Sequence, residues 1–127
     1  MDYSELSDKE INKLVAFALG CKEVVPDIFM DDVRRYEFDK PKNKSGNKFY
    51  FDPCNSPADA WPIIVEHEIS IIKDSGLHMW CSTDKAYWCD GCEWQISQEI
   101  MDANPLRAAM IVFLMMQESA NVQDNPA

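Results

Sequence analysis

Two pairs of residues able to bind a metal lie close together in the second half of the chain. His78 and Cys81 are separated by two residues, and so are Cys89 and Cys92. Imidazole and thiolate groups at this spacing are typical ligands of tetrahedral zinc. Free cysteines are also among the residue types most often buried as small apolar groups. We therefore expect either a structural zinc site at these four residues or, as the favoured interpretation, plain core cysteines, and no other cofactor.

A second set of residues could bind a small ligand such as a nucleotide signal. Tyr50, Trp61 and Trp80 offer aromatic faces, and six of the 12 basic residues fall within the segment 33–52. Aromatic rings beside cations can hold bases and phosphates. The alternative, which we favour, is a solvated loop whose lysines keep an edge strand from aggregating. The alternation of tryptophans with cysteines over 80–94 is explained by ordinary strand packing.

Arg107 is the third candidate, because it is a charge at the start of an otherwise apolar helix. We expect its guanidinium either to contribute to the ligand site or to reach a carboxylate such as Asp59. The second role would hold two helix starts together.

Catalytic signals are weak. The chain has two histidines and lacks the phosphate-binding, dinucleotide-binding and nucleophile-elbow motifs of the common enzyme classes. We therefore expect a protein that is not an enzyme.

Composition points to one acidic domain. The 127 residues are 46% hydrophobic and carry a formal net charge of −10. Negative charge opposes binding to nucleic acid or to anionic membranes, and it favours a basic partner. The N-terminus resembles no signal peptide, and five cysteines, an odd number, fit a reducing compartment. We expect a cytoplasmic protein with no direct nucleic-acid or membrane binding.

Three helices are predicted, at 8–19, 57–67 and 105–118. Ser7 and Glu10 form a capping box for the first, Ser56 caps the second, and Asn104 caps the third. Every residue from 108 to 116 is apolar, which predicts a buried helix far too short to span a bilayer. This run could equally form the interface of a homodimer.

Alternating and aromatic runs predict strands at 33–39, 48–52, 69–73, 77–82 and 86–89. A turn is expected at 83–85, and a short helical piece is expected at 96–101. The resulting fold class is α+β, with an antiparallel sheet of about five strands packed against the C-terminal helix. We expect one domain over 1–119 and a disordered polar tail at 120–127.

Three blocks of the chain resemble a known family. They are the N-terminal segment 1–16, the segment 54–64 with the string P-A-D-A-W-P-I-I, and the segment 104–119 with the string N-P-L-R-A-A-M-I-V-F-L-M-M-Q. They are similar to the NinX-like proteins of lambdoid phages and prophages in enteric bacteria. This resemblance implies a small phage accessory protein, and it carries over no catalytic or binding residues.

The resemblance, the acidic charge and the weak catalytic signals together favour an interaction protein. We expect it to bind a host or phage protein and alter its activity, with counter-defence as one version. The alternative is a protein that binds or sequesters a nucleotide signal.

Overall fold

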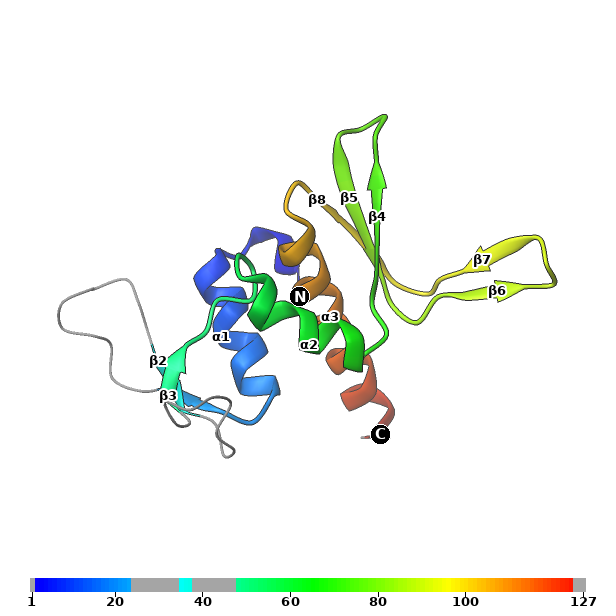
Figure 1. Cartoon of the computed structure of the whole chain (residues 1–127). Coiled ribbons are helices and arrows are strands. Elements are labelled where there is room, and N and C mark those ends of the chain that lie inside the picture. The colour runs from blue at the N-terminus through cyan, green and yellow to red at the C-terminus, as the bar shows by residue number, and fades with distance from the viewer. Residues whose placement is uncertain (1, 24–34, 38–47, 125–127) are drawn as a thin grey trace.

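The computed structural model describes residues 2–23, 35–37 and 48–124. A short 3-10 helix, η1 (Tyr3–Glu5), precedes three α-helices: α1 (Asp8–Ala18), α2 (Pro57–Glu66) and α3 (Pro105–Asp124). The helices lie together at the centre of the molecule, with strands on either side of them (Figure 1). None of the described helices has the length and apolar character needed to cross a bilayer.

Each helix begins where its capping residue predicts. The hydroxyl oxygen of Ser7 accepts a hydrogen bond from the backbone N of Glu10 at 3.2 Å, and Ser56 caps α2 in the same way. The Oδ1 atom of Asn104 accepts from the backbone N of Leu106 at 2.9 Å. Local capping therefore sets all three helix starts.

The helix ends agree less closely with the prediction. α1 and α2 each end one residue early, whereas α3 continues past 118 to Asp124. It thus occupies most of the segment predicted as a tail, and residues 125–127 lie outside the described part of the chain.

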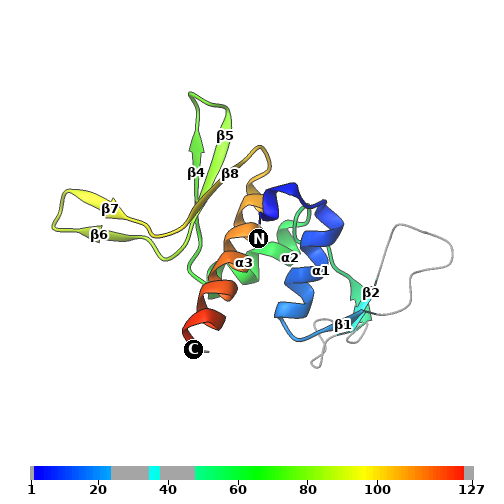
Figure 2. The same cartoon turned by 180° about the vertical axis from the view of Figure 1, so that it is seen from behind.

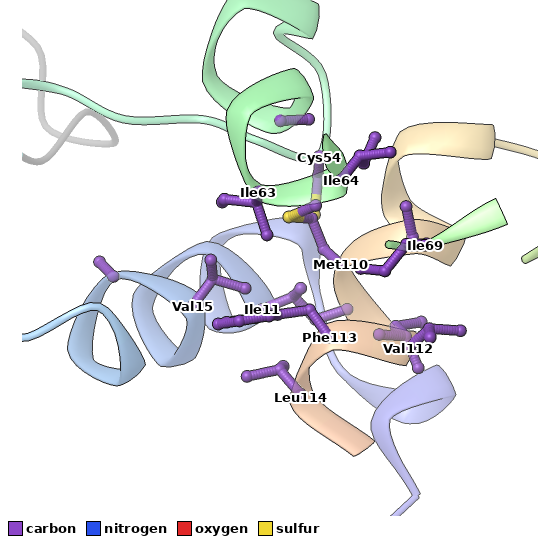
Figure 3. Packing of buried hydrophobic residues seen from close by; sticks show 14 of the residues in the cluster. Ile11, Val15, Cys54, Ile63, Ile64, Ile69, Met110, Val112, Phe113 and Leu114 are labelled. Atoms are coloured by element: carbon purple, nitrogen blue, oxygen red, sulfur yellow. The ribbon is translucent and has the colours of Figure 1, made fainter. Parts of the chain in front are cut away.

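The core is built around α3. Residues 108–114 of this helix are all buried, and they pack against apolar side chains of α1 and α2. Figure 3 shows Phe113 and Met110 meeting Ile11 from α1 and Ile63 from α2. Much of the long apolar run therefore finds its partners within the same chain.

Buried polar groups join the same helices. The side-chain amide of Asn12 donates to Oδ1 of Asp52 at 2.7 Å, and its Oδ1 atom accepts from the backbone N of Cys54 at 3.1 Å. The amide of Asn104 then donates to the carbonyl of Cys54 at 2.7 Å. Burial, followed by the nearby charge of Asp8, raises the pKa of the Cys54 thiol to about 12. This thiol is a neutral core group.

The strands form three separate antiparallel sheets. One contains β1 (Lys22–Glu23), β2 (Arg35–Glu37) and β3 (Lys48–Tyr50) in that order. The second has the order β4 (Ser70–Asp74), β5 (Met79–Thr83) and β8 (Glu99–Asp102). The third is the pair β6 (Tyr87–Cys89) and β7 (Glu93–Gln95).

The α+β class is confirmed, but the prediction of one five-stranded sheet was wrong. The β1–β2–β3 sheet lies on the opposite side of the helices from β4, β5 and β8, so these strands cannot join (Figures 1 and 2). The predicted helical piece at 96–101 was also wrong. Its residues Ile100 and Met101 pair with Ser82 and Cys81 as part of β8.

The β5–β8 pair and the β6–β7 pair are the inner and outer halves of one long hairpin. Thr83 pairs with Glu99, and Tyr87 pairs with Gln95. Both pairs are centred on Gly91, so the register is the same on both sides of the break. The hairpin runs over 79–102 and is interrupted at 84–86 and 96–98. Its outer half projects away from the body (Figures 1 and 2).

Candidate functional site

The projecting part of the hairpin, residues 84–98, is here called the aromatic arm. Its turn consists of Asp90 and Gly91, whose φ angles are 50° and 70°. The backbone N of Cys92 donates to the carbonyl of Cys89 at 3.1 Å and closes this turn. Asp-Gly is a preferred sequence where two successive residues need positive φ, so the local sequence determines the tip of the arm.

Two tryptophans face each other across the arm. Trp88 and Trp94 are directly paired in the register, and their ring centroids are 5.3 Å apart at an interplanar angle of 68°. This edge-to-face geometry is the favourable one for aromatic rings. The residues are nevertheless 51% and 63% exposed, and Tyr87 is exposed on the other face. The expected strand packing is therefore found between these two tryptophans, but much of their surface stays in water.

The base of the arm is held by Asp84. Its buried carboxylate accepts hydrogen bonds from the backbone N atoms of Ser97 and Gln98 at 3.3 and 3.2 Å, and from the Ser97 hydroxyl at 2.6 Å. The backbone N of Asp84 also donates to the carbonyl of Gln98 at 3.2 Å, so the side chain adds to the backbone pairing at the break. The amide of Gln98 also donates to the Ser119 hydroxyl at 2.8 Å, which ties the base to α3.

The outer part of the arm, residues 86–98, carries negative charge only, and the one cation of the arm, Lys85, lies at its base. Asp90 lies at the turn and Glu93 on β7, while no Lys or Arg occurs from 86 to 98. The side-chain amide of Gln95 donates to Glu93 at 3.1 Å on the face opposite the tryptophan pair. The arm thus presents exposed aromatic side chains with a carboxylate at the turn and another on the opposite face.

The four residues proposed as zinc ligands do not come together. The turn expected at 83–85 is instead the break in the long hairpin, so the chain runs on and places Cys89 and Cys92 at the tip of the arm. His78 lies in the β4–β5 turn, and Figure 1 shows the two tips pointing apart. Among the described residues, no three His, Cys, Asp or Glu side chains form a group that could hold a metal.

Cys81 lies in β5, with its sulfur 3.8 Å from Oε2 of Glu99. Burial and then this carboxylate raise the pKa of the thiol, which disfavours the thiolate that zinc requires. Cys81 is therefore a thiol that lies beside Glu99 of the neighbouring strand β8.

The residues proposed for a small ligand come from four different elements. Trp61 is 62% exposed on α2, and Trp80 is half-buried on β5, where the Lys73 ammonium lies 5.1 Å from its ring centroid. Tyr50 belongs to β3, but its side chain and the lysine-rich loop lie outside the described part of the chain.

Arg107 joins the N-terminal segment to α3 rather than reaching Asp59. Its Nη1 atom contacts Asp8 at 2.8 Å, and its Nε atom contacts Asp102 at 3.0 Å. Its Nη2 atom donates to the carbonyls of Ser4 and Leu6 at 3.1 and 2.7 Å. Asp59 was the wrong carboxylate, because it instead accepts from a backbone N beside its own helix, that of Asp52. The expected role is confirmed, since Asp8 begins α1 and Arg107 lies in the first turn of α3. The guanidinium is thus satisfied by internal acceptors.

Comparison with protein families gives one finding. The family described as Bacteriophage P22, NinX matches residues 2–117, which include α1, α2, the whole aromatic arm and α3 as far as residue 117. No curated protein matches the chain.

Proposed function

The chain belongs to the NinX family of bacteriophage proteins, and from that premise we propose that it is a non-enzymatic accessory protein that binds a host or phage protein in the host cytoplasm. The observation that carries this proposal is the aromatic arm. Trp and Tyr dominate the energetically important positions of protein interfaces, and exposed groups of large apolar side chains often mark such interfaces. We assign the binding role to Tyr87, Trp88 and Trp94.

The position of the arm supports this assignment. The arm lies outside the helical core, so its aromatic side chains contribute little to holding that core together. An exposed tryptophan leaves apolar area in water, and burial against a partner would remove that area with a gain in free energy. Altered activity of the partner would then follow from occlusion of its surface. Counter-defence against a host nuclease is one version of this role.

The test is capture from a lysate of phage-infected cells with three forms of the protein. The wild type and Trp61→Ala should recover the same stoichiometric partner, whereas the double variant Trp88→Ala/Trp94→Ala should lose it. Trp61 is a matched control because its exposure equals that of Trp94 within 1%. Recovery of no partner by any form, or equal recovery by all three, would refute the proposal.

The nucleotide-binding alternative stays a prediction. A ligand that binds only the folded state must raise the unfolding temperature. A thermal-shift screen of nucleotides, with Trp80→Ala as the comparison, distinguishes it from the interaction role.

A further inference from the structure

The aromatic arm also defines the chemistry of its partner, an inference that rests on the function proposed above. Trp rings attract cations to their faces more strongly than other aromatic side chains do. The chain uses this interaction internally, since Lys73 lies over Trp80. In the part of the chain that the structure describes, no lysine or arginine lies over Trp88 or Trp94. Their exposed rings are therefore available to a cation from outside.

The charges around the pair favour the same ligand. Asp90 at the tip and Glu93 on β7 are exposed, and the chain outside 22–48 holds five Lys and Arg against sixteen Asp and Glu, a formal charge of −11. Such a field attracts cationic segments and accelerates their association. It repels phosphate, so stacking of nucleic-acid bases on these rings is disfavoured because that mode needs a basic groove.

The geometry favours arginine over lysine. A planar guanidinium can stack on an indole ring while its N–H groups bind a carboxylate, whereas an ammonium group is a compact and strongly hydrated charge. The Asp84 hydrogen bonds and the Trp88–Trp94 contact hold the arm in one shape before binding. Less conformational entropy is then lost when a partner docks.

We propose that the aromatic arm binds an arginine-rich basic segment of a partner protein. Guanidinium groups stack on the tryptophan pair, and other arginines of the same segment pair with Asp90 at the tip and with Glu93 on the opposite face. A segment of this kind is typical of surfaces that bind nucleic acid, so occupation by this acidic protein would compete with the nucleic acid.

The test is titration of the full chain with a deca-arginine peptide, in which isothermal titration calorimetry measures the affinity. Trp88→Ala/Trp94→Ala should weaken binding about tenfold, as expected for the loss of two cation–π contacts, while Trp61→Ala should bind like the wild type. Asp90→Asn/Glu93→Gln keeps both rings and should lower the affinity and its salt dependence. Deca-lysine should bind more weakly than deca-arginine, and deca-glutamate should not bind.

Equal affinity of the double tryptophan variant and Trp61→Ala for deca-arginine would overturn this inference, because binding would then reflect net charge alone. The lysate experiment separates the two proposals. If capture depends on Trp88 and Trp94 but deca-arginine neither binds nor competes, the partner chemistry is refuted while the interaction role stands. If capture does not depend on the pair, the proposed function itself fails.

Discussion

Arg107→Ala is predicted to destabilise the fold strongly, because one guanidinium holds the N-terminal segment against the start of α3. The Arg107 side chain is only 13% exposed and donates to two carboxylates and two carbonyls. Burial lowers the pKa of Arg107, but Asp8 and Asp102 outweigh this effect and raise it, so the group stays charged. Its removal leaves like charges close together and carbonyls without donors.

The magnitude follows from the exposure of the partners. Removing one partner of a buried ion pair costs about 3–5 kcal/mol. The Asp8 side chain is 41% exposed, so solvent screens its part of the interaction, whereas Asp102 is 20% exposed. We therefore expect a loss of about 2–3 kcal/mol in the free energy of unfolding. For a domain of this size the melting temperature should fall by roughly 10 °C.

Urea denaturation of Arg107→Ala and Arg107→Lys measures this loss. The lysine variant keeps the charge but not the planar set of donors, so it should recover only part of the stability. Lys85→Ala removes an exposed cation and serves as the control that should change nothing. Asp102→Asn completes a double-mutant cycle. A loss below about 0.5 kcal/mol for Arg107→Ala, or no coupling in the cycle, would refute the reasoning.

Three further perturbations test other parts of the structure. Asp84→Ala should increase the rate of amide hydrogen exchange at Ser97 and Gln98 more than tenfold, since hydrogen bonds to a charged group contribute about 1.5–3 kcal/mol. Unchanged exchange rates would show that Asp84 does not hold the arm. Because folding raises the pKa of Cys54, the thiol loses its proton at lower pH in the unfolded state than in the folded state. The free energy of unfolding should therefore be unaffected by this thiol below pH 9 and should fall by up to about 1.4 kcal/mol per pH unit as the pH rises towards 12. The difference in the free energy of unfolding between the wild type and Cys54→Ala should therefore shrink as the pH rises above 9. A difference that does not change with pH would contradict the assigned burial of Cys54. Treatment with EDTA should leave the melting temperature unchanged, because the four residues proposed as zinc ligands lie in two hairpins; a clear drop would restore the zinc hypothesis.

The sequence predicts the helices well because their signals are local. Ser7 and Asn104 cap helices by accepting hydrogen bonds from residues two or three positions away. The unbroken apolar run after Arg107 has to be buried whatever the arrangement of the other elements. These features need no knowledge of the remaining chain.

The arm could not be predicted in the same way, since its form depends on pairing across the chain. Asp84 accepts hydrogen bonds from Ser97 and Gln98, which lie 13 and 14 residues away. The segment 83–85, which was expected to be a tight turn, is therefore a break within a longer hairpin. Alternation places Trp88 and Trp94 on one face of a ribbon, but it does not say whether anything covers that face. Their exposure follows only from the projection of the arm beyond the helices.

The unbroken register of the long hairpin makes the arm a separable part of the molecule. The register is continuous across the break, and side chains alternate between the two faces of a strand. The removal or addition of two residues on each strand of the arm would therefore keep the register of β5 and β8 and leave every side chain on its present face. Length and side chains of the arm can therefore vary while the helical core keeps its packing. A phage lineage could retarget such a protein by exchanging the arm alone, and an engineer could graft the arm onto another hairpin because Asp84 and its partners Ser97 and Gln98 move with it.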